Sequence, residues 1–484
     1  MKTTKQNGTQ PRIVIIGGGI AGLSAAWQIR QMQGQHAVHC TVLEADERWG
    51  GKIVTERFEV LDNGRTVGPF VVDAGPESFI TRKPGAWDLA CELGMRDQVI
   101  NPGSETRNIY VVDGGRPVQL PMSPVAFVRS RLISTRGKLR MFQEPFIPAR
   151  RDDGDESLAA FVSRRLGREA LDKFIGPVLG GIYNTDPEHQ SILTTSPVMR
   201  EMERDGGSLV AGSVGRMRAK AKLRKAAAAK GETLPPSFIT FRDGADLLVN
   251  ELVRQLDENS AFDLRLKSEV AAIERVAGAG GYGLHLAGDE PLVADAIIFA
   301  TPANVAARLL QPMAPASAAA LAQIRHVHIG TISLAFREAD LNFANPISGL
   351  MIPRREKRLI DAMTFTSAKF PDRTPAGYAL MRVFFGGGAP HTMDLDDEAL
   401  CDTVMGELQS LLGVEAKPLG YAIQRWPASY PQADVGHLGR VDEMERGLPA
   451  GLAVTGSSYR GLGVPDCVEQ GRTTAADVVR ALAG

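Results

Sequence analysis

The chain has 484 residues, and its 55 basic and 56 acidic side chains leave a formal net charge of −1. That length is too great for one ordinary core, so two or three domains are expected. The balanced charge offers no overall attraction for nucleic acid and argues against nucleic acid as a partner. The four cysteines lack metal-binding spacing, and the N-terminus lacks an apolar signal core. We therefore expect a cytoplasmic protein with free thiols.

The N-terminal segment predicts a dinucleotide-binding βαβ unit. Residues 13–16 form an apolar strand, a helix follows a glycine-rich turn, and a second strand over 39–43 ends at Glu44. Such a turn brings the backbone close to a pyrophosphate, and an acid about 20 residues later binds ribose hydroxyls. The residues predicted to bind the nucleotide here are Gly17, Gly18, Gly19, Ile20, Ala21, Gly22 and Glu44.

The residues that follow favour flavin over nicotinamide. The stretch Glu44-Ala45-Asp46-Glu47-Arg48-Trp49-Gly50-Gly51-Lys52 resembles the Glu-x-x-x-Arg-x-Gly-Gly segment of FAD-dependent amine-oxidase-type flavoproteins. The resemblance implies that FAD is the cofactor and that Arg48, Gly50, Gly51 and Lys52 help to hold it.

The middle of the first half alternates short strands with helices. A short strand with a Gly-Pro turn is predicted over 71–79, a helix over 85–93 and a hairpin with an Asp-Gly turn over 108–118. Helical spacing dominates from about Pro124 to Met202, with Ser157 as an N-cap, and indicates a helical insertion. The basic run from Gly215 to Lys225 is interpreted as a solvated, partly mobile connector, with attraction to anionic lipid or a partner as the alternative.

The second half completes a split fold. Residues 238–245 resume the core, followed by a helix, and strands are predicted over 264–270 and 294–302. Runs at 327–336, 349–352, 362–365 and 379–385 predict an antiparallel sheet suited to a flat substrate, before a helix over 396–412. The predicted fold is α/β (α+β), with a split Rossmann-type FAD-binding domain, an antiparallel-sheet substrate domain and a helical insertion. The FAD-binding domain is predicted to comprise residues 1–95, 236–305 and 441–484. The hairpin and the helical insertion cover residues 96–205, a basic linker covers 206–235, and the substrate domain covers 306–440.

Several longer motifs carry a more specific resemblance. They are Gly75-Pro76-Glu77-Ser78-Phe79 with Arg82-Lys83-Pro84, Gly180-Gly181-Ile182-Tyr183 with Asp186-Pro187, Trp426-Pro427 with Pro431-Gln432 and Gly436-His437, and the ending Gly456-Ser457-Ser458-Tyr459 with Gly461-Leu462-Gly463-Val464-Pro465-Asp466-Cys467. Together they resemble the oxygen-dependent porphyrinogen oxidases of haem biosynthesis over nearly the whole chain. The resemblance implies three two-electron oxidations of coproporphyrinogen III or protoporphyrinogen IX by FAD, with dioxygen as acceptor and hydrogen peroxide as product. It leaves open peripheral contact with a membrane and contact with another haem-pathway enzyme.

The resemblance also implies site residues. For FAD they are Gly75, Pro76, Glu77, Ser78, Val270, Gly456, Ser457, Leu462, Gly463 and Val464. For the substrate they are Arg107, Gly181, Met351, Lys369 and Phe384. Arg107 and Lys369 would bind carboxylates, with a surface position as the alternative, and Lys369 would favour coproporphyrinogen III because it carries more of them.

Other side chains have more ordinary interpretations. Met351, Phe384 and Phe385 would form apolar walls, with core packing as the alternative. No catalytic side chain is expected, because the flavin carries the chemistry and pyrrole nitrogens exchange protons with water. No metal site is expected either, and His326 and His328 are interpreted as ordinary strand residues.

Three other functions remain as alternatives. Flavin amine oxidases and carotenoid desaturases share the cofactor motifs, but the ending and the Gly180–Tyr183 motif favour a porphyrinogen oxidase over both. A non-catalytic protein that binds flavin or porphyrin would have less need of the complete set of cofactor glycines.

Overall fold

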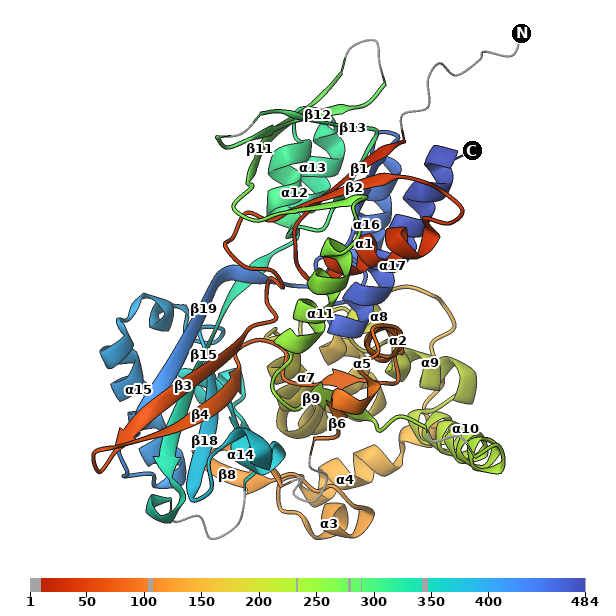
Figure 1. Cartoon of the computed structure of the whole chain (residues 1–484). Helices are drawn as coiled ribbons and strands as arrows, with labels where there is room; N and C mark the ends of the chain where they lie inside the picture. Colours follow the sequence, from red (N-terminus) through yellow and green to blue (C-terminus); the bar gives the residue numbers. More distant parts are fainter. Residues whose placement is uncertain are drawn as a thin grey trace.

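The computed structural model describes residues 10–102, 108–231, 234–276, 280–288, 290–341 and 347–483. In Figure 1 a nucleotide-binding region lies at the top, a large sheet at the lower left and a helical region at the lower right. The α/β fold class is confirmed. Within the described ranges, no helix combines the length and apolar character needed to cross a membrane.

The nucleotide-binding region is built on a five-stranded parallel sheet whose strands come from three separate parts of the chain. Its order is β10 (Phe262–Arg265), β2 (His39–Leu43), β1 (Arg12–Ile16), β14 (Ala296–Phe299) and β20 (Leu452–Val454). The central strands β1 and β14 are apolar except for Arg12, because both faces of the sheet are covered.

Four helices pack on one face of this sheet. They are α1 (Ile20–Met32), α2 (Gly85–Glu92), α11 (Asp246–Asp257) and α17 (Val464–Ala483). The other face is covered by α12 (Ala303–Leu310), α13 (Pro315–Ala322), α16 (His437–Arg446) and an antiparallel sheet of β11 (Val270–Arg275), β12 (Tyr282–Leu286) and β13 (Leu292–Ala294).

The large sheet has seven strands and is antiparallel except where β16 runs parallel to β7. Its order is β19 (Gly420–Pro431), β15 (His326–Arg337), β18 (Tyr378–Phe385), β17 (Ile360–Phe365), β16 (Gly349–Met351), β7 (Ile109–Asp113) and β8 (Arg116–Gln119). Helix α15 (Asp397–Leu412), capped by the Asp396 side chain, packs on one face. The opposite face carries Ala335 and Leu380, which pack on another part of the chain.

Two smaller sheets join the regions. A hairpin of β3 (Thr55–Asp62) and β4 (Arg65–Asp73) packs against the large sheet. Strand β9 (Phe238–Phe241) pairs with β5 (Phe79–Ile80) and β6 (Val99–Ile100).

The helical region follows the predicted insertion, and Ser157 caps α5 as expected. Its elements are α3 (Pro124–Arg129), α4 (Thr135–Phe142), η2 (Glu144–Phe146), α5 (Leu158–Arg165), α6 (Arg168–Ala170), η3 (Leu171–Ile175), α7 (Gly176–Tyr183), α8 (Ile192–Thr195), α9 (Pro197–Gly206) and α10 (Leu209–Ala229). The remaining short helices are η1 (Arg96–Gln98), η4 (Glu338–Asp340), η5 (Arg354–Glu356), α14 (Thr366–Lys369), η6 (Pro371–Arg373) and η7 (Pro390–Asp394).

Several sequence-based expectations need correction. The basic run 215–225, interpreted as a solvated and partly mobile connector, lies inside the exposed helix α10, because its alanine, lysine and arginine residues are good helix formers. The residues predicted as one strand, 264–270, contain the end of β10 and the start of β11 instead. A turn at Lys267, whose φ is 53°, separates the two strands. The turn of the 108–118 hairpin is Gly114-Gly115 rather than Asp-Gly, and β3 and β19 were not predicted.

Candidate nucleotide and substrate site

The glycine turn after β1 leaves the start of α1 accessible. Gly22 packs so closely on the turn that a Cβ atom there would overlap the carbonyl oxygen of Gly17. Around Gly19, by contrast, a Cβ atom would meet no heavy atom within 4 Å. No described side chain caps α1, which leaves amides of its first turn for a ligand, whereas the Leu23 amide already donates to the Gly19 carbonyl at 3.0 Å. This is an arrangement that binds a pyrophosphate.

Glu44 lies beside this turn at the end of β2. Its Oε2 accepts a hydrogen bond from the Gly18 amide at 2.7 Å, and its Oε1 accepts one from the Asp46 amide at 2.9 Å. A carboxylate offers about four lone-pair sites, which leaves acceptor capacity for ribose hydroxyls. Val270 packs in the same apolar cluster as Leu43, the residue before Glu44.

The loop after Glu44 is fastened to the glycine turn. The Gly50 amide donates to the Gly18 carbonyl at 2.9 Å, and Arg48 Nη2 donates to the Gly51 carbonyl at 2.7 Å. Arg48 therefore holds the shape of its own loop. Burial lowers the pKa of the Lys52 ammonium at the end of this loop.

The C-terminal motif returns to the same helix. A Cβ atom at Gly456 would lie 3.7 Å from the Cβ of Ala21 at the start of α1. Val464 opens α17 and packs in the core cluster that includes α1. The preceding turn is fixed by Asp466, which accepts from the Gly463 amide at 3.2 Å and pairs with Lys83 at 2.5 Å. The first and last predicted cofactor motifs thus meet at α1.

The segment from Gly75 to Ser78 connects this region to the large sheet. Only glycine fits at position 75, because a Cβ atom there would overlap the Lys52 carbonyl oxygen. From the sheet, the Arg382 guanidinium donates to the carbonyls of Ala74 and Gly75, and Thr331 Oγ1 donates to Ala74 at 3.3 Å. Pro76 and Ser78 are half-buried in this segment.

Buried charge gathers beside the same segment. Lys369 Nζ lies 2.7 Å from Glu77 Oε2, and Arg373 Nη1 lies 2.5 Å from Asp73 Oδ2. Burial alone would raise the pKa of Glu77, but Lys369 and Arg382 outweigh it and hold the pKa below its ordinary value. Lys369 is therefore not an exposed loop lysine. It ends α14 and balances the charge of Glu77.

The strand register places the predicted apolar substrate residues in one row. Met351 is opposite Ala362, and Ala362 is opposite Phe384, so the three side chains share a face. Gly181 of α7 lies against this row, since a Cβ atom there would be 3.2 Å from Met351 Sδ. The next residue in the row is Thr331, which contacts the 74–77 segment. The row therefore runs from the helical region to the nucleotide region.

Phe385 does not belong to this row. It is fully buried on the opposite face, in the cluster with Val383 that packs on α15. Side chains alternate along a strand, so Phe384 and Phe385 point to opposite faces, and Phe385 follows the alternative expectation of core packing. Arg107 lies outside the described residues.

The two strand histidines have different surroundings. Burial lowers the pKa of His326, and His328 Nδ1 accepts from the Ala428 amide at 3.3 Å. Within the ranges that the structure describes, no group of three His, Cys, Asp or Glu side chains is placed to hold a metal ion.

Sequence reasoning missed the charge pairing. Glu77 and Lys369 are 292 positions apart, and Asp73 and Arg373 are 300 apart, so no local pattern could join them. Arg382 did leave a signal, because it is a single charge inside the apolar run Ala379–Phe385. Such a charge in a buried strand requires partners nearby.

Comparison with known proteins identifies the family. The family model described as flavin containing amine oxidoreductase matches residues 20–479. A coproporphyrinogen III oxidase from Propionibacterium freudenreichii is 32% identical over 97% of this chain and 91% of its own length. Protoporphyrinogen oxidase 2 from Arabidopsis thaliana is 27% identical over 97% of this chain and 93% of its own.

A solved structure agrees with this result. A protein from Exiguobacterium, assigned provisionally as a protoporphyrinogen oxidase, superimposes with a TM-score of 0.82 at 26% identity, covering 98% of this chain and all of that one. The chain therefore belongs to the flavin-containing amine oxidoreductases, in the branch of that family that includes the porphyrinogen oxidases.

Proposed function

We propose that this chain is a coproporphyrinogen III oxidase that uses FAD, with dioxygen as the electron acceptor. The main support is the row formed by Met351, Ala362 and Phe384, which reaches the 74–77 segment beside the nucleotide region. An apolar surface next to cationic side chains suits a flat macrocycle that carries carboxylates at its edge. The name of the relative at 32% identity is in keeping with this choice.

The nucleotide residues fit the flavin cofactor of the family. The amides at the start of α1 would hold the pyrophosphate, and Glu44 would accept hydrogen bonds from the ribose. The loop 50–52 and the segment 456–464 would enclose the rest of the FAD molecule. When bound, FAD supplies the capacity to accept two electrons at each oxidation step.

The chain's own contribution is to position the substrate and exclude water. Phe384 is held by the Arg382 guanidinium, which lies 4.5 Å over its ring. Gly181 leaves room beside Met351 because it has no side chain. The substrate's pyrrole N–H groups would lose their protons to water, so this surface needs no dedicated base.

The charges beside Glu77 favour the substrate with more carboxylates. Asp73 and Glu77 face three cations, Lys369, Arg373 and Arg382, which leaves one positive charge in excess. The Lys369 side chain is 29% exposed, so a ligand can reach it. Coproporphyrinogen III would gain more from this charge than protoporphyrinogen IX.

Dioxygen would complete the cycle. Each step removes two hydrogen atoms from the porphyrinogen, and one dioxygen takes up two electrons and two protons to give hydrogen peroxide. Three steps would therefore consume three dioxygen molecules for each porphyrin formed.

The test compares substrates with purified, flavin-loaded protein in air, following porphyrin fluorescence and peroxide. We expect kcat/KM for coproporphyrinogen III to exceed that for protoporphyrinogen IX by about 10-fold, or about 1.4 kcal/mol. Equal values, or a preference for protoporphyrinogen IX, would contradict the choice of substrate. Turnover of amines alone would identify an amine oxidase instead.

A further inference from the structure

An arginine follows the end of β16, beside the substrate row. Strand β16 ends at Met351, and the short helix η5 begins at Arg354. The chain between them runs along the start of β17, because the Ile352 amide donates to the Asp361 carbonyl at 3.1 Å. Arg354 therefore lies at the same end of these two strands as the row member Met351.

The Arg354 guanidinium faces the helix that bounds the row. Its Nη2 donates to the Asn184 carbonyl at 3.3 Å. Asn184 directly follows α7, the helix whose Gly181 lies against Met351, and its side chain donates to the His328 carbonyl of β15 at 3.0 Å. Gly181 and Arg354 are both exposed. The guanidinium therefore lies on the side of the sheet that carries the row, where a ligand can reach it.

Arg354 keeps spare hydrogen-bond donors. A guanidinium presents several N–H groups in one plane, and in the described ranges its polar partner is the Asn184 carbonyl. Arg354 reduces the pKa shift that burial causes in Asp361, but the oxygens of this acid accept from the Gly387 and Gly388 amides at 2.8 and 2.7 Å. Arg354 can therefore bind a ligand carboxylate through two parallel hydrogen bonds.

The cations that follow Arg354 are engaged by acids and fix the short helix η5. Arg355 pairs with Asp113, the last residue of β7, at 2.9 Å. Arg358, just beyond η5, pairs with Glu407 of α15 at 3.2 Å. These two pairs hold η5 against neighbouring elements, so Arg354 is positioned before a ligand binds, which lowers the entropic cost of binding.

Arg354 and Lys369 lie at opposite ends of β17. The strand runs from Ile360 to Phe365, with Arg354 beside its start, and α14, which ends at Lys369, follows it directly. A strand of this length spans about 17–20 Å, which is comparable with the width of a porphyrinogen and its side chains. Ala362, the row member on β17, lies between the two ends. The row thus has a cation at each end of this strand.

We propose that Arg354 binds a substrate carboxylate on the side of the macrocycle opposite to Lys369. This inference rests on the proposed function. Coproporphyrinogen III carries a propionate on every pyrrole ring, so it can reach both cations at once. Protoporphyrinogen IX carries propionates on one side only, so it can reach one of them. Arg354 thereby selects the substrate with carboxylates on both sides.

The test is equilibrium binding of the two porphyrin products to the flavin-loaded protein, without turnover. Fluorescence titration in a mild detergent, which keeps the porphyrins monomeric, gives Kd for coproporphyrin III and protoporphyrin IX. Arg354→Gln should weaken binding of coproporphyrin III about 10-fold and that of protoporphyrin IX by less. Arg354→Lys should recover part of the loss, since it keeps the charge without the planar pair of donors. Lys357→Gln is the matched control, because it removes an exposed positive charge just after η5 and should leave Kd unchanged.

The possible failures are distinguishable. Equal affinity of the wild type and Arg354→Gln for coproporphyrin III would overturn the role of Arg354 and leave the proposed function intact. An equal loss of affinity in Lys357→Gln would also overturn it, because the effect would then come from overall charge. If the wild type bound neither porphyrin, the proposed function itself would be contradicted and the role of Arg354 with it. Unfolding temperature and flavin content check that each variant is folded.

Discussion

At the scale of single residues, a buried side chain beside the candidate site keeps its charge only where a side chain of opposite charge lies next to it. Glu77 is 9% exposed, yet it carries its charge because Lys369 and Arg382 stand next to it. Removing one member of a buried pair costs about 3–5 kcal/mol, since the other is left unpaired, whereas removing both costs less. The Glu77–Lys369 pair is therefore best tested by a double-mutant cycle.

We predict that Lys369→Met lowers the free energy of unfolding at pH 7 by about 3 kcal/mol and that adding Glu77→Gln restores part of the loss. Urea unfolding of the four proteins measures the coupling. Because the pKa of folded Glu77 lies below its ordinary value of 4.5, its stabilising effect is present above that pH. The advantage of wild type over Glu77→Gln should then disappear as the pH falls through the folded pKa. A coupling energy near zero would contradict this interpretation.

The glycine turn gives a second prediction at this scale. Gly22→Ala forces α1 away from the turn, because the added Cβ would overlap the Gly17 carbonyl oxygen. FAD affinity should fall about 10-fold or more, which corresponds to about 1.4 kcal/mol. Flavin retention and fluorescence titration measure it. Gly34→Ala is the control, since a Cβ atom there meets no heavy atom within 4 Å. Similar losses of FAD affinity in both variants would contradict the role of the glycine turn in FAD binding.

At the scale of elements, the two faces of β18 have different roles. Phe384 lies in the row with Met351, whereas Phe385 packs in the core under α15. Phe384→Ala should raise KM for the porphyrinogen about 10-fold with little loss of stability. Phe385→Leu should lower the free energy of unfolding by about 1–2 kcal/mol with KM unchanged. Steady-state kinetics and urea unfolding of both variants check this, and the reverse pattern would mean that the ligand face is wrongly assigned.

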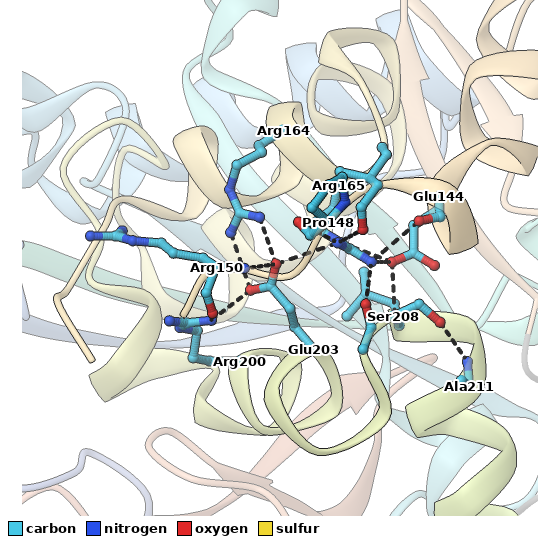
Figure 2. Close-up of polar contacts among 12 residues, drawn as sticks. Glu144, Pro148, Arg150, Arg164, Arg165, Arg200, Glu203, Ser208 and Ala211 are labelled. Atoms are coloured by element: carbon cyan, nitrogen blue, oxygen red, sulfur yellow. Dashed lines mark hydrogen bonds and ion pairs between the residues drawn. The ribbon is translucent and has the colours of Figure 1, made fainter. Parts of the chain in front are cut away.

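The buried network of the helical region is a second element-scale case. Figure 2 shows Glu144 beside Arg165, whose Nε donates to Glu144 Oε1 at 2.8 Å. Glu144 also holds the start of α10 through the amides of Leu209 and Val210. Glu144→Gln should lower the free energy of unfolding by about 3 kcal/mol and speed hydrogen exchange at those amides. Glu201→Gln is the control, because the Glu201–Arg216 pair is exposed and should contribute less than about 1 kcal/mol. Unchanged exchange at Leu209 would contradict the role of Glu144.

Elements with strong local signals were predictable from the sequence. The apolar run of β1, the Ser157 cap of α5 and the Asp396 cap before α15 all act within a few residues. The hairpin β3–β4 was missed although Asn63 and Gly64, both with positive φ, form a typical hairpin turn. Its strands are half exposed and lack a continuous apolar pattern.

The candidate site was only partly predictable for a related reason. The nucleotide residues from Gly17 to Glu44 act within one local βαβ unit and therefore leave a motif. The substrate row depends instead on the register between β16, β17 and β18, which joins Met351 to Phe384 through Ala362. Long-range register and charge pairing are set by tertiary packing, so a single sequence cannot reveal them.

At the scale of the whole molecule, distant segments converge on one helix. Gly471 of α17 packs so closely on α1 that a Cβ atom would overlap the Ala21 carbonyl oxygen, which brings the C-terminal motif to the glycine turn. The large sheet reaches the same region through Arg382 and Thr331. The fold thus joins the proposed nucleotide site to the proposed substrate row, as porphyrinogen oxidation by a bound flavin would require.

The most direct measurement of that function is anaerobic mixing of the flavin-loaded protein with coproporphyrinogen III. We predict that the absorbance of the oxidised flavin is lost while porphyrin fluorescence rises, and that admitting air restores the flavin and yields peroxide. A flavin that stays oxidised in the presence of the porphyrinogen would contradict the proposed function.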